Sequence, residues 1–162
     1  MFFTGTDMFE GDGAAATFHS VIKSGGNGQV LAKVYASSNL VANTPYFVKV
    51  CYTTANANWF QATEPTASGI GMVGIPSAAI ASGCVGWVTV RGICNDAQAP
   101  ATSFTGSVGK AIYLSGATGI GCTGSAYIGA PHQIGIMITT AANSSTTCTI
   151  LLTGNLYARA IS

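Results

Sequence analysis

The chain has 162 residues, enough for one domain with a buried core, and 48% of them are hydrophobic while only 7% are charged. An ordinary soluble domain has about a quarter of its residues charged. The surface of this protein must therefore consist largely of Ser, Thr, Asn and Gln side chains, or be covered by partner chains. The net charge is +1 and the cations are scattered singly, which argues against nucleic-acid or anionic-membrane binding. No apolar run approaches the roughly 20 residues of a membrane span, and no signal peptide is indicated, so we expect the protein to stay, at least initially, in the cytoplasm where it is made.

The first 28 residues differ in composition from the rest of the chain. They hold three of the five acidic residues, four of the seven Phe and six glycines. Aromatic side chains on a glycine-punctuated, acid-bearing segment are not typical of a core helix or strand. We therefore predict an extended N-terminal arm over residues 1–28 that contacts a neighbouring subunit or the rest of the domain. The contact residues predicted in this arm are Phe2, Phe3, Phe9 and Phe18.

Residues 29–162 are predicted to form one β-domain. Short apolar segments recur about every ten residues and are separated by Gly- and Ser-rich turns, which is typical of a small antiparallel β-barrel or a sandwich. Glycines inside three of these segments indicate tight bends or close backbone approach, and no strict internal repeat is visible. The expected strands are Val30–Tyr35, Tyr46–Tyr52, Ile70–Ile75, Val85–Gly92, Lys110–Leu114, Ala126–Ile128, Gln133–Ile138 and Cys148–Leu152, with Leu156–Ile161 as a candidate edge strand. The three glycines are Gly74, Gly86 and Gly135.

The residues that carry catalytic chemistry are few and separated. There are two histidines, His19 and His132, and no motif brings either one to a nucleophile or a carboxylate. The five cysteines include no closely spaced pair, so we predict no metal site. Because their number is odd and no secretion signal is indicated, we predict five unpaired thiols. We expect no enzymatic activity and no cofactor. The cysteines are Cys51, Cys84, Cys94, Cys122 and Cys148.

Two tryptophans are candidate core or contact residues. Trp87 alternates with Val85 and Thr89 on one strand face, so we predict that it is a core residue. Trp59 and Phe60 follow a polar loop, and core packing or a subunit interface is favoured for them over a sugar-binding platform. Both join the predicted contact residues.

The central segments resemble the small-barrel core of capsid decoration (cement) proteins of tailed bacteriophages. Gly71–Pro76 is similar to a "VGVP" strand in that family, Ala81–Gly92 to an "SGxxGW" turn and strand, and Gly109–Ala111 to a "GxA" strand. The resemblance implies homotrimers on the capsid exterior, bound to the major capsid protein where capsomers meet. It implies no catalytic or cofactor-binding residue.

The sequence therefore predicts a virion structural protein that binds the outside of the assembled coat shell and stabilises it through protein–protein contacts. Another virion component, such as a head-fibre base or a tail protein, is the first alternative. A carbohydrate-binding β-sandwich that uses Trp59 is the second. Copy number relative to the coat protein separates decoration from the other virion parts, and glycan binding would favour the sandwich.

Overall fold

The computed structural model of the chain describes residues 22–50, 60–64, 72–98, 104–106, 108–115, 121–123, 133–139 and 141–154. This part of the chain contains twelve β-strands, one short 3₁₀ turn (η2, Gly26–Gly28) and no α-helix, which confirms the all-β prediction. The strands are β1 (Ile22–Ser24), β2 (Val30–Ala36), β3 (Tyr46–Val50), β4 (Phe60–Thr63), β5 (Met72–Pro76), β6 (Val85–Gln98), β7 (Phe104–Gly106), β8 (Ala111–Ser115), β9 (Gly121–Thr123), β10 (Gln133–Met137), β11 (Ala141–Ser145) and β12 (Thr147–Leu152).

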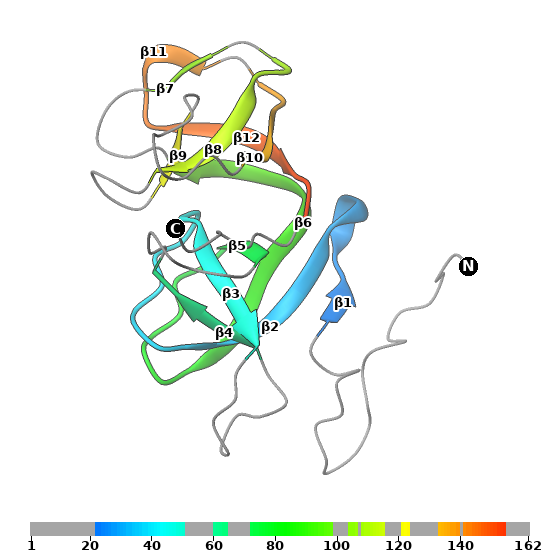
Figure 1. The fold of residues 1–162 in the computed structure, drawn as a ribbon, viewed down its shortest axis with the longest axis vertical. Helices are drawn as coiled ribbons and strands as arrows, with labels where there is room; N and C mark the ends of the chain where they lie inside the picture. The colour runs from blue at the N-terminus through cyan, green and yellow to red at the C-terminus, as the bar shows by residue number, and fades with distance from the viewer. Residues whose placement is uncertain are drawn as a thin grey trace, which may run out of the picture.

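Five of these strands close into a barrel. The order is β2-β4-β3-β5-β6, and β6 pairs back with β2 (Figure 1). Four of the five pairings are antiparallel, as predicted, whereas β2 and β4 run parallel. Many of the side chains that line the interior are small and apolar, because a five-stranded barrel leaves little room inside. They include Ala32, Val34, Val48, Ala62, Val88 and Val90.

The strand β6 is longer than the predicted Val85–Gly92 and connects two halves of the molecule. Its first part belongs to the barrel, and after Gly92, which has a φ of 100°, its second part pairs with β12. The strands β10, β8 and β9 extend this second sheet, which lies above the barrel in Figure 1. A positive φ in mid-strand favours glycine and lets one strand turn from one sheet into the next.

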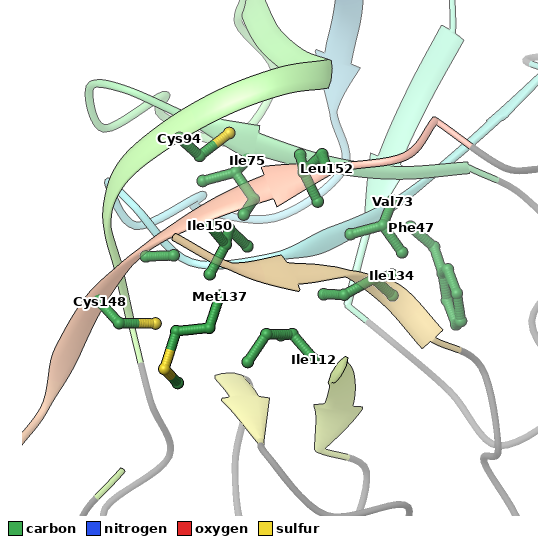
Figure 2. Packing of buried hydrophobic residues seen from close by; sticks show 11 residues of the cluster. Phe47, Val73, Ile75, Cys94, Ile112, Ile134, Met137, Cys148, Ile150 and Leu152 are labelled. Atoms are coloured by element: carbon green, nitrogen blue, oxygen red, sulfur yellow. The ribbon is translucent and has the colours of Figure 1, made fainter. Parts of the chain in front are cut away.

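A second core lies between this sheet and the outer surface of the barrel. Phe47 from β3 and Ile75 from β5 pack with Ile134 and Leu152 from the second sheet (Figure 2). The neighbours of Phe47 on its strand, such as Tyr46, face the barrel interior. The first three residues of β3, Tyr46 to Val48, are therefore buried on both faces of the strand, and the two halves of the molecule are connected through this strand.

The barrel contains an internal repeat that the sequence analysis did not find. The β2–β6 pair aligns Val34 with Gly86, and the β3–β5 pair aligns Tyr46 with Gly74. Each residue of the first pair differs by 40 in number from a residue of the second, so segment β2–turn–β3 is equivalent to segment β5–turn–β6. The strand β4 lies between β2 and β3 but has no counterpart between β5 and β6.

The turns of the two repeats have the same hydrogen bonds. Leu40 and Ile80, which also differ by 40, form a bridge in which each N–H donates to the other's carbonyl, at 2.8 and 3.0 Å. Two further equivalent bonds run across the pair of turns: Asn43 N–H to Pro76 O at 2.7 Å, and Gly83 N–H to Ala36 O at 2.8 Å. Asn43 and Gly83 both have a positive φ, at 62° and 79°. The repeat is therefore one of backbone conformation more than of sequence.

The three strand glycines lie where the sequence analysis predicted close approach. A Cβ on Gly74 would stand 2.6 Å from a methyl group of Val88, and one on Gly86 would stand 2.5 Å from a methyl group of Ile80. A Cβ on Gly135 would overlap a backbone carbonyl of β12. The first two approaches are to side chains and the third is to backbone.

The structure describes the last seven residues of the predicted arm, and three of them, Ile22–Ser24, belong to the sheet. The strand β1 pairs antiparallel with β2, and Ile22 packs partly against the barrel core. The rest of the arm, residues 1–21, lies outside the described residues, as do the expected strands Ala126–Ile128 and Leu156–Ile161.

Candidate interaction surface

The end of the barrel formed by the two equivalent turns is the first candidate surface; we call it the barrel end and define it as residues 37–44 and 77–84. Beneath it, Leu40 and Ile80 are 1% and 9% exposed and fill the mouth of the barrel. Above them lies a set of exposed side chains without a single charge. They are Ser37, Asn39, Val41, Ser77, Ala78, Ala79, Ala81, Ser82 and Cys84.

Hydrogen bonds hold the barrel end in one conformation. Ser82 N–H donates to Asn39 Oδ1 at 2.9 Å, and the Ser82 hydroxyl donates to the carbonyl of Ser37 at 3.3 Å. The Val41 N–H donates to the hydroxyl oxygen of Tyr46 at 2.7 Å. Burial raises the pKa of Tyr46, and this bond from Val41 partly opposes the rise. A surface fixed in this way loses little conformational freedom when a partner covers it.

The exposed large apolar side chain of the barrel end is Val41, at 59%. Interfaces between proteins are depleted of charge at their centres, and an uncharged rigid surface with an exposed valine fits that description. The chemistry that it can offer is van der Waals contact and neutral hydrogen bonding. The sequence analysis did not select these residues, because single Ser, Ala and Val residues carry no signal until the two turns are brought together.

A second candidate surface lies on the outer face of β1, β2 and β6. The Lys23 ammonium stands 4.2 Å from the centroid of the Trp87 ring, and the Lys33 ammonium stands 6.0 Å from it. We call these three residues the lysine–tryptophan face. An ammonium group within about 6 Å of the ring centroid is attracted to the face of the ring by a cation–π interaction.

The prediction that Trp87 is a core residue is wrong in this structure. Its neighbours Val88 and Val90 face the barrel interior, and the indole is half-buried on the outer face. The alternation that placed Trp87 with Val85 and Thr89 was correct in period but assigned the wrong face, because period-2 alternation does not say which side is the core.

The predicted contact residues have different outcomes. Phe60 is 7% exposed and belongs to the barrel core, where it lies beside Val34 in the β2–β4 pairing. Its side chain therefore has a packing role in the folded chain. The other predicted contact residues lie outside the described residues: Phe2, Phe3, Phe9, Phe18 and Trp59.

Three of the five thiols are described and all three are free, in agreement with the prediction for them. Cys84 is exposed on the barrel end, while Cys94 and Cys148 are buried in the second core. Burial raises the pKa of Cys94 to about 12, against a smaller lowering by its hydrogen bond with Thr89. Burial also raises the pKa of Cys148 to about 11. Both buried thiols stay protonated and unreactive near neutral pH.

Within the part of the chain that the structure describes, no group of three or more His, Cys, Asp and Glu side chains could hold a metal ion. No helix among the same residues is long and apolar enough to cross a membrane. The two histidines lie outside the described ranges.

Comparison with known proteins gives little for function. No protein-family model and no curated protein matches the chain. A crystal structure of the head fibre gp8.5 N base from bacteriophage phi29 is similar, with a TM-score of 0.49 and 12% identity over 81% of this chain and 99% of that chain.

Proposed function

We propose that this chain is a non-enzymatic structural component of a tailed-phage virion, a decoration (cement) protein that binds the outside of the coat shell. The observation that carries the proposal is the barrel end, a rigid surface whose exposed side chains are all uncharged. A surface of this kind is suited to burial against protein. In this proposal the partners are the major capsid protein and two further copies of the chain, arranged as a homotrimer on the capsid exterior.

The sequence supports the same proposal independently. The segments that resemble cement proteins include β5 (Met72–Pro76), the last part of the second turn of the barrel end and the first part of β6. A chain with 7% charged residues also fits a protein whose surface is covered in an assembly.

A matched pair of valines tests the proposal. Val41 on the barrel end is 59% exposed, and Val108, in the turn before β8, is 61% exposed. Val41→Glu places an unpaired carboxylate inside the proposed interface and should weaken binding to purified expanded shells by more than about tenfold. Val108→Glu should bind as the unchanged protein does. Co-sedimentation with shells at increasing protein concentration measures both affinities, and equal binding by the two variants would exclude the barrel end as the attachment surface.

Copy number separates decoration from a head-fibre base or a tail protein. A cement protein saturates the shell at a fixed ratio to the coat protein, whereas a fibre base or tail protein is present in few copies. Quantitative mass spectrometry of intact virions measures this ratio. A ratio far below that of the coat protein would replace decoration by the other virion role.

The N-terminal arm enters the proposal as a second attachment. Its aromatics, Phe2, Phe3, Phe9 and Phe18, are anchors for neighbouring subunits or the coat lattice, and weak contacts at separate points add through avidity. Trp59 is proposed as a further contact. Deletion of residues 1–20 should leave the circular dichroism spectrum native and reduce shell binding. Unchanged binding of a folded deletion variant would remove the arm from the attachment.

A further inference from the structure

The turn between β1 and β2 has a conformation that explains its sequence. Gln29 N–H donates to Gly26 O at 3.2 Å and Gly25 N–H donates to Gln29 O at 2.8 Å, so the β1–β2 hairpin closes here. Inside the turn, Asn27 has a φ of 56° and a ψ of 37°, and Gly28 has a φ of 72°. Positive φ at both central positions is the requirement of a type I′ turn, and Asn followed by Gly is the pair that such turns prefer.

This turn lies against the corner of β6. Gln29 Nε2 donates to the carbonyl of Ile93, the residue that follows the bend at Gly92. A Cβ on Gly92 would stand 2.8 Å from Gln29 Cα and 3.0 Å from Gly28 O. The conformation of the turn is therefore held by contacts with the bend of β6 as well as by the hydrogen bonds of its own hairpin.

The turn also contains a reactive pair of residues. Asn27 is exposed, and it is the one Asn in the sequence that precedes a glycine. An Asn before Gly deamidates without an enzyme, because glycine has no side chain to hinder attack by its own backbone nitrogen. The Gly28 nitrogen loses its proton and bonds to Asn27 Cγ, the Cγ–Nδ2 bond breaks, and ammonia leaves. Water then opens the cyclic imide at either carbonyl and gives aspartate or isoaspartate.

The folded turn keeps the reacting atoms apart. At a ψ of 37°, Gly28 N lies nearly opposite the Asn27 Cβ across the Cα–C bond, so no rotation of the side chain brings Cγ to bonding distance. Ring closure needs a large rotation about ψ, which breaks the bond from Gln29 N–H to Gly26 O. The reaction therefore proceeds only from an open form of the turn.

We propose that Asn27 is a deamidation site that the folded turn protects, and that the bond from Gln29 to Ile93 limits how often the turn opens. Aspartate is accepted in a turn of this type, so that product keeps the fold. Isoaspartate adds a methylene group to the main chain, so that product loses the turn and its contacts with the bend of β6. Either product lowers the net charge of the protein from +1 to 0.

Peptide mapping of the full-length protein by mass spectrometry tests the protection. In mildly alkaline buffer, Asn27 should deamidate at least about tenfold more slowly in the folded protein than in guanidinium chloride. Asn43, which also has a positive φ but precedes Thr44, is the internal reference and should stay intact. Equal rates in the folded and unfolded protein, or no deamidation of Asn27 in the unfolded protein, would overturn the proposal.

A matched pair of glutamine variants tests the bond to Ile93. Gln29→Ala should raise the rate in the folded protein by about 2- to 10-fold and leave the rate in the unfolded protein unchanged. Gln98→Ala, near the other end of β6, is the control and should change neither rate. Circular dichroism checks that both variants are folded. Equal folded-state rates in the two variants would show that the bond does not limit opening, which contradicts the proposal.

The response to denaturant separates opening of the turn from unfolding of the whole domain. Local opening exposes little surface, so the folded-state rate should change little at denaturant concentrations well below the unfolding midpoint. A steep rise there would mean that only global unfolding exposes Asn27, and the turn would then have no role of its own.

The products give a further measurement. Ion exchange separates deamidated from unchanged protein by charge, and electron-transfer fragmentation identifies the isoaspartate fraction. The Asn27→Asp variant is the matched control, because it carries the new charge without the added methylene group. The isoaspartate form should have a lower Tm than Asn27→Asp, and an equal Tm would contradict the loss of the turn. None of these measurements involves a capsid, so their outcome is independent of shell binding through the barrel end.

Discussion

Replacement of Gly74 by alanine tests the packing inside the barrel. A Cβ at this position would stand 2.6 Å from a methyl group of Val88 and 2.7 Å from a methyl group of Val48. These valines belong to β6 and β3, the two neighbours of β5, so the new methyl group would push against both sides at once. Ordinary carbon–carbon contacts are about 3.5–4.0 Å, and valine has few alternative rotamers, so both strands must move by about 1 Å.

The expected cost follows from these contacts. Overpacking of a core costs about 1–3 kcal/mol, and the lower entropy of unfolded alanine returns about 0.4–1 kcal/mol of it. Gly74→Ala should therefore destabilise the protein by up to about 2.5 kcal/mol, which is a fall in Tm of several degrees for a chain of this size. A Cβ on Gly26 would meet no atom within 4 Å, and Gly26 has no positive φ, so Gly26→Ala is the control and should be neutral or slightly stabilising.

A double variant identifies the cause. Val48→Ala removes one of the two methyl contacts, so Gly74→Ala should cost less in the Val48→Ala background than alone, by about 1 kcal/mol. Urea unfolding followed by circular dichroism gives the four free energies. If Gly74→Ala is as stable as Gly26→Ala, or if its cost is unchanged by Val48→Ala, the barrel interior is not packed as the structure indicates.

Three further results are expected. The pKa of the Cys94 thiol is near its ordinary value of 9.0 in the unfolded chain and about 12 in the folded one, so the stability that this thiol contributes is full below pH 9 and is lost as the pH rises from 9 towards 12. The fall in Tm over this pH range should therefore be smaller for Cys94→Ala than for the unchanged protein. At pH 8, iodoacetamide should label Cys84 but not Cys94 in the folded protein. Tyr46→Phe leaves the Val41 N–H without its partner and should lower the free energy of unfolding by about 1–3 kcal/mol, measured by urea titration. Leu40→Ala should cost about 2–5 kcal/mol, whereas Val41→Ala, at a 59% exposed position, should stay within about 0.5 kcal/mol, and equal thermal shifts would contradict the role of Leu40 in filling the barrel mouth.

Local sequence patterns determined the class of the fold. β-branched and aromatic segments separated by Gly and Ser turns predicted the strands, because those residues fit a pleated surface and those turns require little side-chain volume. The strand glycines were interpreted correctly as sites of close approach, since a glycine in a strand has few other uses. The free state of Cys84, Cys94 and Cys148 agrees with the prediction made for them, which rested on the odd count and on the rule that cytoplasmic thiols stay reduced.

Pairing between strands far apart in the chain determined which faces of the strands are buried and which turns lie together, and local sequence patterns did not show either. The run Tyr46-Phe47-Val48 is apolar on both sides because β3 has the barrel interior on one face and the second core on the other, and no local pattern distinguishes that from a strand in a single sheet. Trp87 faces outward because Val88 and Val90 of the same strand point into the barrel interior. On the outer face β1 brings Lys23 over the indole ring, a contact between residues far apart in the chain. The repeat was invisible for a related reason. Its two copies keep the same backbone hydrogen bonds and positive φ values, but the residue at the positive φ is Asn43 in one copy and Gly83 in the other. Only the closed barrel, by placing Leu40 against Ile80, assembles the uncharged barrel end from residues that carry no signal one at a time.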